Sequence, residues 1–161
     1  MISQKEILAY FLPILEKYGN HYKKVTLVKA KKAESGTWII TKTSDGFETK
    51  NQAKAGDMLV ENQTSSLEQY LVKEEVFSKR YEIEQGLEQG WAIYNPIGEI
   101  LAYSVSNVDF EFFGVLDVLE FEAPWGESMI LKRGDYLATP PERNEIYRIA
   151  QKEFSETYKE V

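Results

Sequence analysis

Apolar side chains recur at helical spacing near the start of the chain. Ser3 and Glu6 form a capping box, a pair of side chains that commonly begins a helix. The apolar positions that follow fall on one broad side of a helix, and they are Ile7, Leu8, Phe11, Leu12, Ile14, Leu15 and Tyr18. Gly19 ends the pattern, and Pro13 lies off the stripe, where it bends the helix without exposing its apolar side. We predict an amphipathic helix within residues 1–20 that packs on the core, with docking of a partner helix as the alternative.

After this helix the pattern changes to short segments rich in β-branched and aromatic residues, separated by turn residues. Such segments are typical of antiparallel strands, and we predict them at 25–28, 38–43, 47–52, 58–61, 69–72, 91–94, 99–105, 115–122, 128–131, 136–138 and 146–149. Two short helices are also expected, because Phe77 and Tyr81 lie four residues apart, as do Phe154 and Tyr158. Residues 82–90 are interpreted as a connector. The pattern predicts an α+β, β-rich fold.

Two parts of the chain resemble each other. The stretch "KAGDML" at 54–59 matches "KRGDYL" at 132–137, and the residues that follow, 68–82 and 145–159, share five identities in fifteen positions. The identical pairs are Glu68 and Glu145, Tyr70 and Tyr147, Phe77 and Phe154, Ser78 and Ser155, and Tyr81 and Tyr158. Agreement at bulky positions with nearly the same spacing predicts an internal duplication.

The duplication predicts how the chain is organised. We expect the N-terminal amphipathic helix at 1–20, a first β-rich repeat at 21–83 and a second at 84–161, packed as one compact globule. Each repeat is expected to be a small antiparallel β unit that ends in a short helix. A half-length ancestor would have been marginally stable alone, so association of two copies about an approximate two-fold axis is the expected origin.

Each copy resembles a small bacterial and phage-borne domain named for its Pro-Gly-Asp-Tyr-Gly (PGDYG) motif. In that domain a turn, a strand pair and a closing Phe-x-x-x-Tyr recur, and here the match runs through "GDML…EQYLV…VFSKRY" and "GDYL…EIYRI…EFSETY", about two thirds of the chain. Neither copy keeps the first Pro or the last Gly of the motif, and Met58 replaces its Tyr in the first copy. The resemblance implies a compact β-rich fold, and it brings no established activity.

Composition narrows the chemistry. The 161 residues include no Cys and a single His, so thiol catalysis, zinc clusters and triads with a Cys or several His are excluded. The N-terminus lacks the features of a signal peptide and no run of 18 apolar residues occurs, which predicts a cytoplasmic protein without a membrane partner. No cofactor and no metal are expected.

Charge bears on the partners. The net charge of −7 argues against nucleic-acid binding, because phosphate neutralisation supplies most non-specific affinity. Lysines are nevertheless concentrated between residues 23 and 32. They mark either a patch for an anionic partner or a solvated strand edge, and we prefer the strand edge because Lys commonly protects such edges.

The two Gly-Asp pairs are the first candidate sites. Gly56 with Asp57 and Gly134 with Asp135 lie between predicted strands, where Gly permits a left-handed backbone and Asp accepts backbone N–H groups. We interpret both pairs as turns. The alternative is a pair of carboxylates that share a proton or a cation.

Aromatic side chains are the second set of candidates. Phe77, Tyr81, Phe154 and Tyr158 are interpreted as the residues that pin short helices to sheets, with a ligand pocket as the alternative. The residues expected to contact a ligand or partner are Trp125, Tyr136, Tyr147, Tyr70 and Trp91.

Two functions fit these observations. The preferred hypothesis is a non-catalytic binding or accessory module that recognises a protein partner or small ligand through its aromatic surface, with a homodimer as one candidate assembly. The alternative is a small hydrolase-like enzyme that uses Tyr and paired carboxylates such as Asp57 and Asp135. We favour the binding module because the sequence contains no nucleophile–base motif and no phosphate-binding fingerprint.

Overall fold

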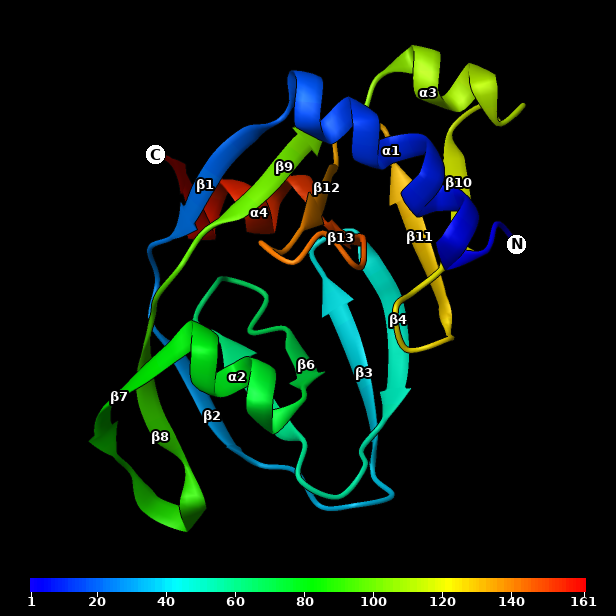
Figure 1. The fold of residues 1–161 in the computed structure, drawn as a ribbon. Coiled ribbons are helices and arrows are strands. Elements are labelled where there is room, and N and C mark those ends of the chain that lie inside the picture. Colours follow the sequence, from blue (N-terminus) through cyan, green and yellow to red (C-terminus); the bar gives the residue numbers. More distant parts are fainter. The chain divides into compact units, whose positions relative to one another are not determined.

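The protein has an α+β, β-rich fold, as predicted. The computed structural model describes residues 1–161, except for the side chains of residues 47 and 48. The N-terminal helix α1 (Gln4–Tyr18) is followed by antiparallel β-sheets and short helices (Figure 1). The chain forms two compact units. Unit 1 holds residues 1–23, 99–155 and 160–161, and unit 2 holds residues 24–98 and 156–159.

Unit 1 is built on a five-stranded sheet with the order β13-β12-β9-β1-β14. These strands are β1 (Asn20–Lys24), β9 (Ile100–Ser104), β12 (Tyr136–Thr139), β13 (Tyr147–Ile149) and β14 (Tyr158–Glu160). The other elements are α3 (Asn107–Phe112), the hairpin of β10 (Val118–Glu122) and β11 (Ser128–Lys132), and α4 (Gln151–Thr157). Residues 156–159, at the end of α4 and the start of β14, group with unit 2.

Unit 2 has its own five-stranded sheet, with the order β6-β5-β2-β8-β7. These strands are β2 (Val28–Lys32), β5 (Met58–Asn62), β6 (Gln69–Val72), β7 (Tyr81–Gly86) and β8 (Ala92–Pro96). The other elements are the hairpin of β3 (Trp38–Thr43) and β4 (Gly46–Gln52), helix α2 (Glu74–Arg80) and the 3-10 turn η1 (Glu88–Gly90).

The two sheets have the same strand order and the same register. Strands β6, β5, β2, β8 and β7 correspond in turn to β13, β12, β9, β1 and β14. In one sheet Ala30 pairs with Val60 and Ala92, and in the other Ala102 pairs with Ala138 and Asn20. A short helix precedes the last strand in both copies. The predicted duplication is therefore visible in the backbone pairing.

Each sheet takes one internal strand from the other repeat. In chain order β1 precedes β2, yet β1 lies between β9 and β14; likewise β8 precedes β9, yet it lies between β2 and β7. The first strands of the repeats are thus exchanged. The boundary between the units consequently falls after Gly98, whereas the sequence-based division at 83/84 followed the repeat along the chain.

Several predicted elements were wrong. Residues 82–90 were expected to be a connector, but most of β7 lies there, and five of its six side chains are exposed. An edge strand of this kind lacks the alternation that identifies a half-buried strand. Strands β1 and β14 and helix α3 were not predicted, and Tyr158, expected in a helix, begins β14. The strand expected at 25–28 lies at Val28–Lys32, and the strand expected at 115–122 begins only at Val118.

Helix α1 contributes its apolar stripe to the core of unit 1. Ile7, Phe11 and Leu15 are fully buried, and they pack with β9, β12 and the β10–β11 hairpin. The stripe is narrower than predicted, because Tyr18 is 62% exposed. The core of unit 2 is smaller and lies between its sheet and α2; its buried members are Val28, Ala30, Met58, Val60 and Phe77.

The strand exchange predicts that a cut between the repeats leaves the protein assembled. A protease site placed at residues 87–90 and cleaved after folding separates β1–β7 from β8–β14. We expect the two fragments to co-elute at the size of the intact chain and to part only in denaturant, because each holds an internal strand of a sheet that the other completes. Size-exclusion chromatography of the nicked protein measures this. Fragments that separate under native conditions would show that the strands are not exchanged.

Candidate functional site

Both Gly-Asp pairs close tight turns. Gly56 and Gly134 have φ angles of 88° and 84°, in the left-handed region that favours glycine. The Asp57 carboxylate accepts a hydrogen bond from the Lys54 backbone N–H at 2.9 Å. The turn before β12 has the equivalent bond. Each Asp therefore holds the backbone that leads into a strand of its sheet.

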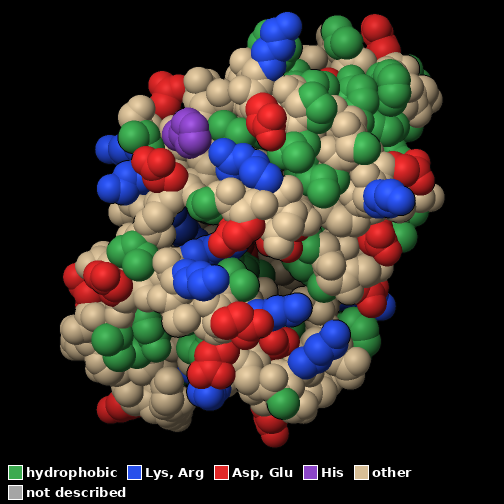
Figure 2. All heavy atoms as spheres, in the orientation of Figure 1, with side chains coloured by type: hydrophobic (Ala, Val, Ile, Leu, Met, Phe, Trp, Pro, Cys, Tyr) green, Lys and Arg blue, Asp and Glu red, His purple; other side chains and the backbone are tan. Residues whose placement is uncertain are grey.

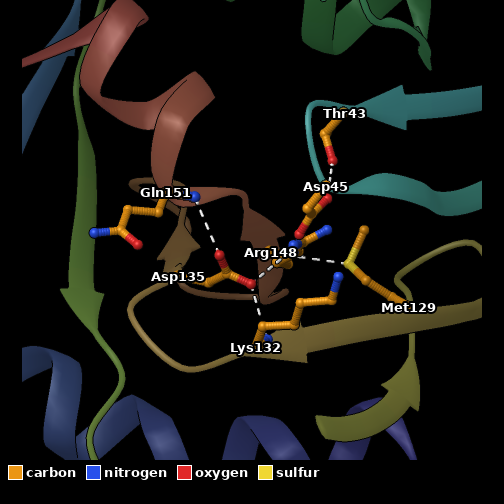
Figure 3. Close-up of polar contacts among 7 residues, drawn as sticks. All are labelled: Thr43, Asp45, Met129, Lys132, Asp135, Arg148 and Gln151. Carbon is orange, nitrogen blue, oxygen red and sulfur yellow. Dashed lines mark hydrogen bonds and ion pairs between the residues drawn. The ribbon is translucent and has the colours of Figure 1, made fainter. Parts of the chain in front are cut away.

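Asp135 makes further contacts that Asp57 lacks. Its Oδ2 accepts hydrogen bonds from the Lys132 backbone N–H and from Arg148 Nε, both at 2.8 Å, and its Oδ1 accepts from the Gln151 backbone N–H at 3.1 Å (Figure 3). The side chains of Asp135 and Arg148 are only 5% and 1% exposed. Asp135 thus joins its turn to β13 and to the start of α4, and its carboxylate is engaged on both oxygens.

The two aspartates should differ in their effect on stability. We expect Asp57→Ala to lower the free energy of unfolding by about 1 kcal/mol, as for one lost hydrogen bond. Asp135→Ala should cost about 3–5 kcal/mol, because it breaks a buried ion pair with Arg148 and removes the acceptor of two backbone N–H groups. Chemical denaturation measures both. The double variant Asp135→Ala with Arg148→Met is the control, and it should lose less than the two single variants added together. Equal losses for Asp57→Ala and Asp135→Ala would contradict this assignment.

The predicted aromatic candidates of unit 1 are mostly packing residues. Tyr136 stacks on Phe154 with ring centroids 3.7 Å apart, and Tyr22 meets both rings edge-on. Tyr147 packs against the core of unit 1. Trp125 lies in the turn of the β10–β11 hairpin and is 37% exposed. These residues hold α4 and the hairpin, and they do not converge on one hollow.

Unit 2 contains a polar cluster beside α2. Lys24 Nζ donates to Asn62 Oδ1 at 2.6 Å, to the Tyr70 hydroxyl at 2.8 Å and to the Tyr81 hydroxyl at 3.0 Å. The two hydroxyls are 3.1 Å apart, and Phe77 stacks on the Tyr81 ring. All three N–H groups of the ammonium are used within the cluster. The network closes on itself, and it ties the start of unit 2 to β5, β6 and β7.

Lys24 also changes the acidity of Tyr81. Burial by itself raises the pKa of the Tyr81 phenol, but the Lys24 ammonium and the hydrogen bonds from Tyr70 and Lys24 outweigh it, and the pKa lies below its ordinary value of 10.0. The register places Pro96 and Pro140 where unit 2 has Lys24 and Asn62, so unit 1 has no such cluster at the equivalent place.

The acidity of Tyr81 can be measured. A spectrophotometric titration at 295 nm of the wild-type protein minus that of Tyr81→Phe isolates this phenol among the ten tyrosines. We expect a midpoint below 10 in the wild-type background. In Lys24→Met the midpoint should rise, because burial remains while the neighbouring charge is gone. Lys23→Met, an exposed neighbour, is the control and should leave the midpoint in place.

The two units differ on the other side of their sheets, the side that faces away from α2 in unit 2. In unit 1, α1 covers this side through Leu101, Tyr103 and Leu137. The register assigns the same places in unit 2 to Lys29, Lys31 and Leu59. Two of the three positions that receive the helix in unit 1 are therefore charged in unit 2.

We call this side of the unit 2 sheet the open face, and define it by Lys29, Lys31, Glu61 and Trp91. All four are half-buried. Helix α2 packs on the other side of the sheet through Phe77, so among the described residues of unit 2 no α-helix lies on the open face.

An open hollow of about 700 Å³ lies at the open face. Its lining residues are Lys29, Glu61, Gly86, Leu87, Glu88 and Trp91. The Lys31 ammonium lies 4.7 Å from the centre of the Trp91 ring, a cation–π contact. Leu87 is 37% exposed, whereas Leu15, its counterpart at the end of α1, is fully buried. The hollow thus corresponds to the place that the last turn of α1 fills in unit 1.

The interpretation of the lysine segment as a strand edge was wrong. Lys29 and Lys31 belong to β2, which is the third of five strands and is paired on both sides. Their side chains point away from the core because they alternate with buried Val28 and Ala30. Lys32, at the end of the strand, forms an exposed ion pair with Glu74 at 3.2 Å.

An apolar patch lies over α3 in unit 1. Its members Val108, Phe112 and Leu116 are 68%, 65% and 79% exposed, and Figure 2 shows hydrophobic side chains gathered in this region. Phe112 stacks on Tyr10 with centroids 4.3 Å apart. Burial and the nearby Asp109 carboxylate raise the pKa of Tyr10 to about 12. Helix α3 lies between β9 and β10, and no helix occupies the corresponding place between β2 and β3 in the described part of unit 2.

The five predicted contact residues do not form one site. Trp125, Tyr136 and Tyr147 belong to unit 1, while Tyr70 and Trp91 lie on opposite sides of the unit 2 sheet. Of these five, only Trp91 borders the hollow. Asn62 and Glu61 were not identified from the sequence, and Lys24 was noted only as one of the lysines of a charged segment. Strand pairing in the fold brings Lys24 beside Tyr70 and Tyr81, and Glu61 beside Lys29. The concentration of lysines between residues 23 and 32 was the available signal.

Comparisons with known proteins give no family assignment. No protein-family model matches the chain, and no curated protein or solved structure matches it significantly. Within the described residues, no three His, Asp or Glu side chains are grouped to hold a metal ion. The described helices include none that is both long and apolar enough to cross a membrane.

Proposed function

We propose that the protein is a non-catalytic binding module whose recognition surface is the open face of unit 2. One observation carries the proposal. Two units of the same chain share strand order and register, yet the side of the sheet that α1 covers in unit 1 has no helix in unit 2 and is hollowed beside Trp91. A surface that a helix seals in one copy and leaves hollow in the other is suited to an external ligand.

The chemistry of the open face supports recognition of a protein segment. Trp91 and Leu87 supply apolar area at the hollow, and charged groups of both signs surround it. Interfaces commonly combine an aromatic anchor with a polar rim in this way. The other proposed use of the chain, hydrolysis by Asp57 and Asp135, receives less support, because Asp135 is buried and both of its carboxylate oxygens already accept hydrogen bonds.

A peptide selection tests the proposal without assuming a partner. A random peptide library displayed on phage is selected against the immobilised wild-type protein, and enriched peptides are measured individually. We expect peptides whose affinity falls at least tenfold for Trp91→Ala, since loss of an aromatic anchor at a hot spot has effects of this size.

Trp38→Ala is the matched control. Trp38 also carries a lysine over its ring, Lys50 at 5.1 Å, but it is 48% exposed on the β3–β4 hairpin. Selected peptides should bind Trp38→Ala as they bind the wild type. Selection that yields no binder, or binders indifferent to Trp91, would refute the open face as the recognition surface.

A further inference from the structure

We infer that the open face receives an amphipathic helix of a partner protein, with a carboxylate of that helix placed against Lys31. This inference rests on the proposed function and adds the kind of partner.

A helix occupies the equivalent face of unit 1. In unit 1 that face is covered by a helix of fifteen residues, held by Ile7, Phe11 and Leu15. The backbone pairing beneath it is the same in unit 2. A sheet face with this strand order and register carries a helix in unit 1, so a helix is the element that we expect on the equivalent face of unit 2.

The segment that precedes the exchanged strand, β1 in unit 1 and β8 in unit 2, differs between the units. In unit 1 the segment before β1 is the end of α1, closed by Gly19. In unit 2 the segment before β8 is the single turn η1, closed by Trp91 at the place of Gly19. The segment before β8, as the structure describes it, therefore provides no α-helix to cover the open face. Trp91 and Leu87 both line the hollow, and Leu87 remains partly exposed there.

The charge of Lys31 favours a carboxylate on the partner helix. In unit 1 Phe11 of α1 lies against Tyr103, with ring centroids 6.4 Å apart, and Lys31 replaces Tyr103 in unit 2. Lys29 has Glu61 as its cross-strand neighbour, but the cross-strand neighbour of Lys31 is Leu59. Lys31 forms no ion pair with any described residue. A helix seated here gains most from a carboxylate at the position that Phe11 occupies in α1.

Glu61 and Glu88 restrict the charge of the rest of the helix. Both residues line the hollow, as does Trp91, whose ring carries the Lys31 ammonium. A uniformly acidic helix would be repelled by them. The partner helix is thus an amphipathic one with a single well-placed acid, rather than an acidic tail.

A peptide derived from α1 tests the inference. A fluorescein-labelled peptide with the sequence of residues 4–18 and Phe11→Glu is titrated with the full-length protein and followed by fluorescence anisotropy. We expect saturable binding that is at least tenfold tighter than that of the unaltered peptide. Circular dichroism of the peptide should show a gain of helix in the complex.

Charge reversal makes the test specific for Lys31. Lys31→Glu should weaken binding of the Phe11→Glu peptide at least tenfold and should favour a Phe11→Lys peptide instead. Lys50→Glu, in the other lysine–tryptophan pair of unit 2, is the matched control and should change neither affinity. The inference would be overturned if the wild-type protein bound the unaltered peptide and the Phe11→Glu peptide equally well. It would also be overturned if Lys31→Glu did not change the affinity for the Phe11→Glu peptide.

The outcomes separate this inference from the proposed function. Library peptides that need Trp91 but bind without becoming helical, or without using Lys31, would leave the open face as the recognition surface and refute the helix. Concentration-dependent dimerisation in analytical ultracentrifugation that Lys31→Glu abolishes would identify a second copy as the occupant, and would also overturn the partner helix. A monomer that binds the Phe11→Glu peptide through Lys31 supports the inference as stated.

Discussion

Hydrogen bonding on both edges of the two exchanged strands is the constraint on which the fold depends. β1 and β8 each lie second from one end of a five-stranded sheet, between strands of the other repeat. Removal of either strand would break two ladders and leave unpaired backbone groups in a sheet interior. Neither repeat is therefore complete by itself. The exchange fixes the register of both sheets, and this common register is what allows residues of one unit to be compared with those of the other.

On this common frame the two units have been used differently. Unit 1 has the larger core, because α1 and the β10–β11 hairpin bring large apolar side chains to the same side of its sheet. The equivalent side of unit 2 carries lysines on its internal strand β2. Burial of an apolar helix stripe against ammonium groups would be unfavourable without paired charges. Lys29 and Lys31, at the places of Leu101 and Tyr103, therefore disfavour a helix with the apolar stripe of α1, and they form a polar face beside Trp91.

Local signals in the sequence predicted the local parts of this structure. The helix N-cap at Ser3, the turn geometry of Gly56 and Gly134, and the α+β class all follow from spacing and turn chemistry. Strand β7 escaped prediction because its side chains are mostly exposed. The placement of Lys29 and Lys31 on an internal strand could not be predicted, since it depends on pairing with β8, more than 60 positions along the chain. Site assembly by strand exchange leaves little trace in local pattern.

Fusion of the repeats in one chain is what permits their asymmetry. In a homodimer of identical repeats, every buried charge and every open face would occur in both subunits. Here Arg148, the partner of Asp135, corresponds to the apolar Leu71 in the other repeat, and Lys24, beside Tyr81, corresponds to Pro96. Each unit has acquired its own polar network at a place where the other has none. The same freedom lets one sheet remain sealed by its helix as a stable support, while the other presents a single open face per molecule.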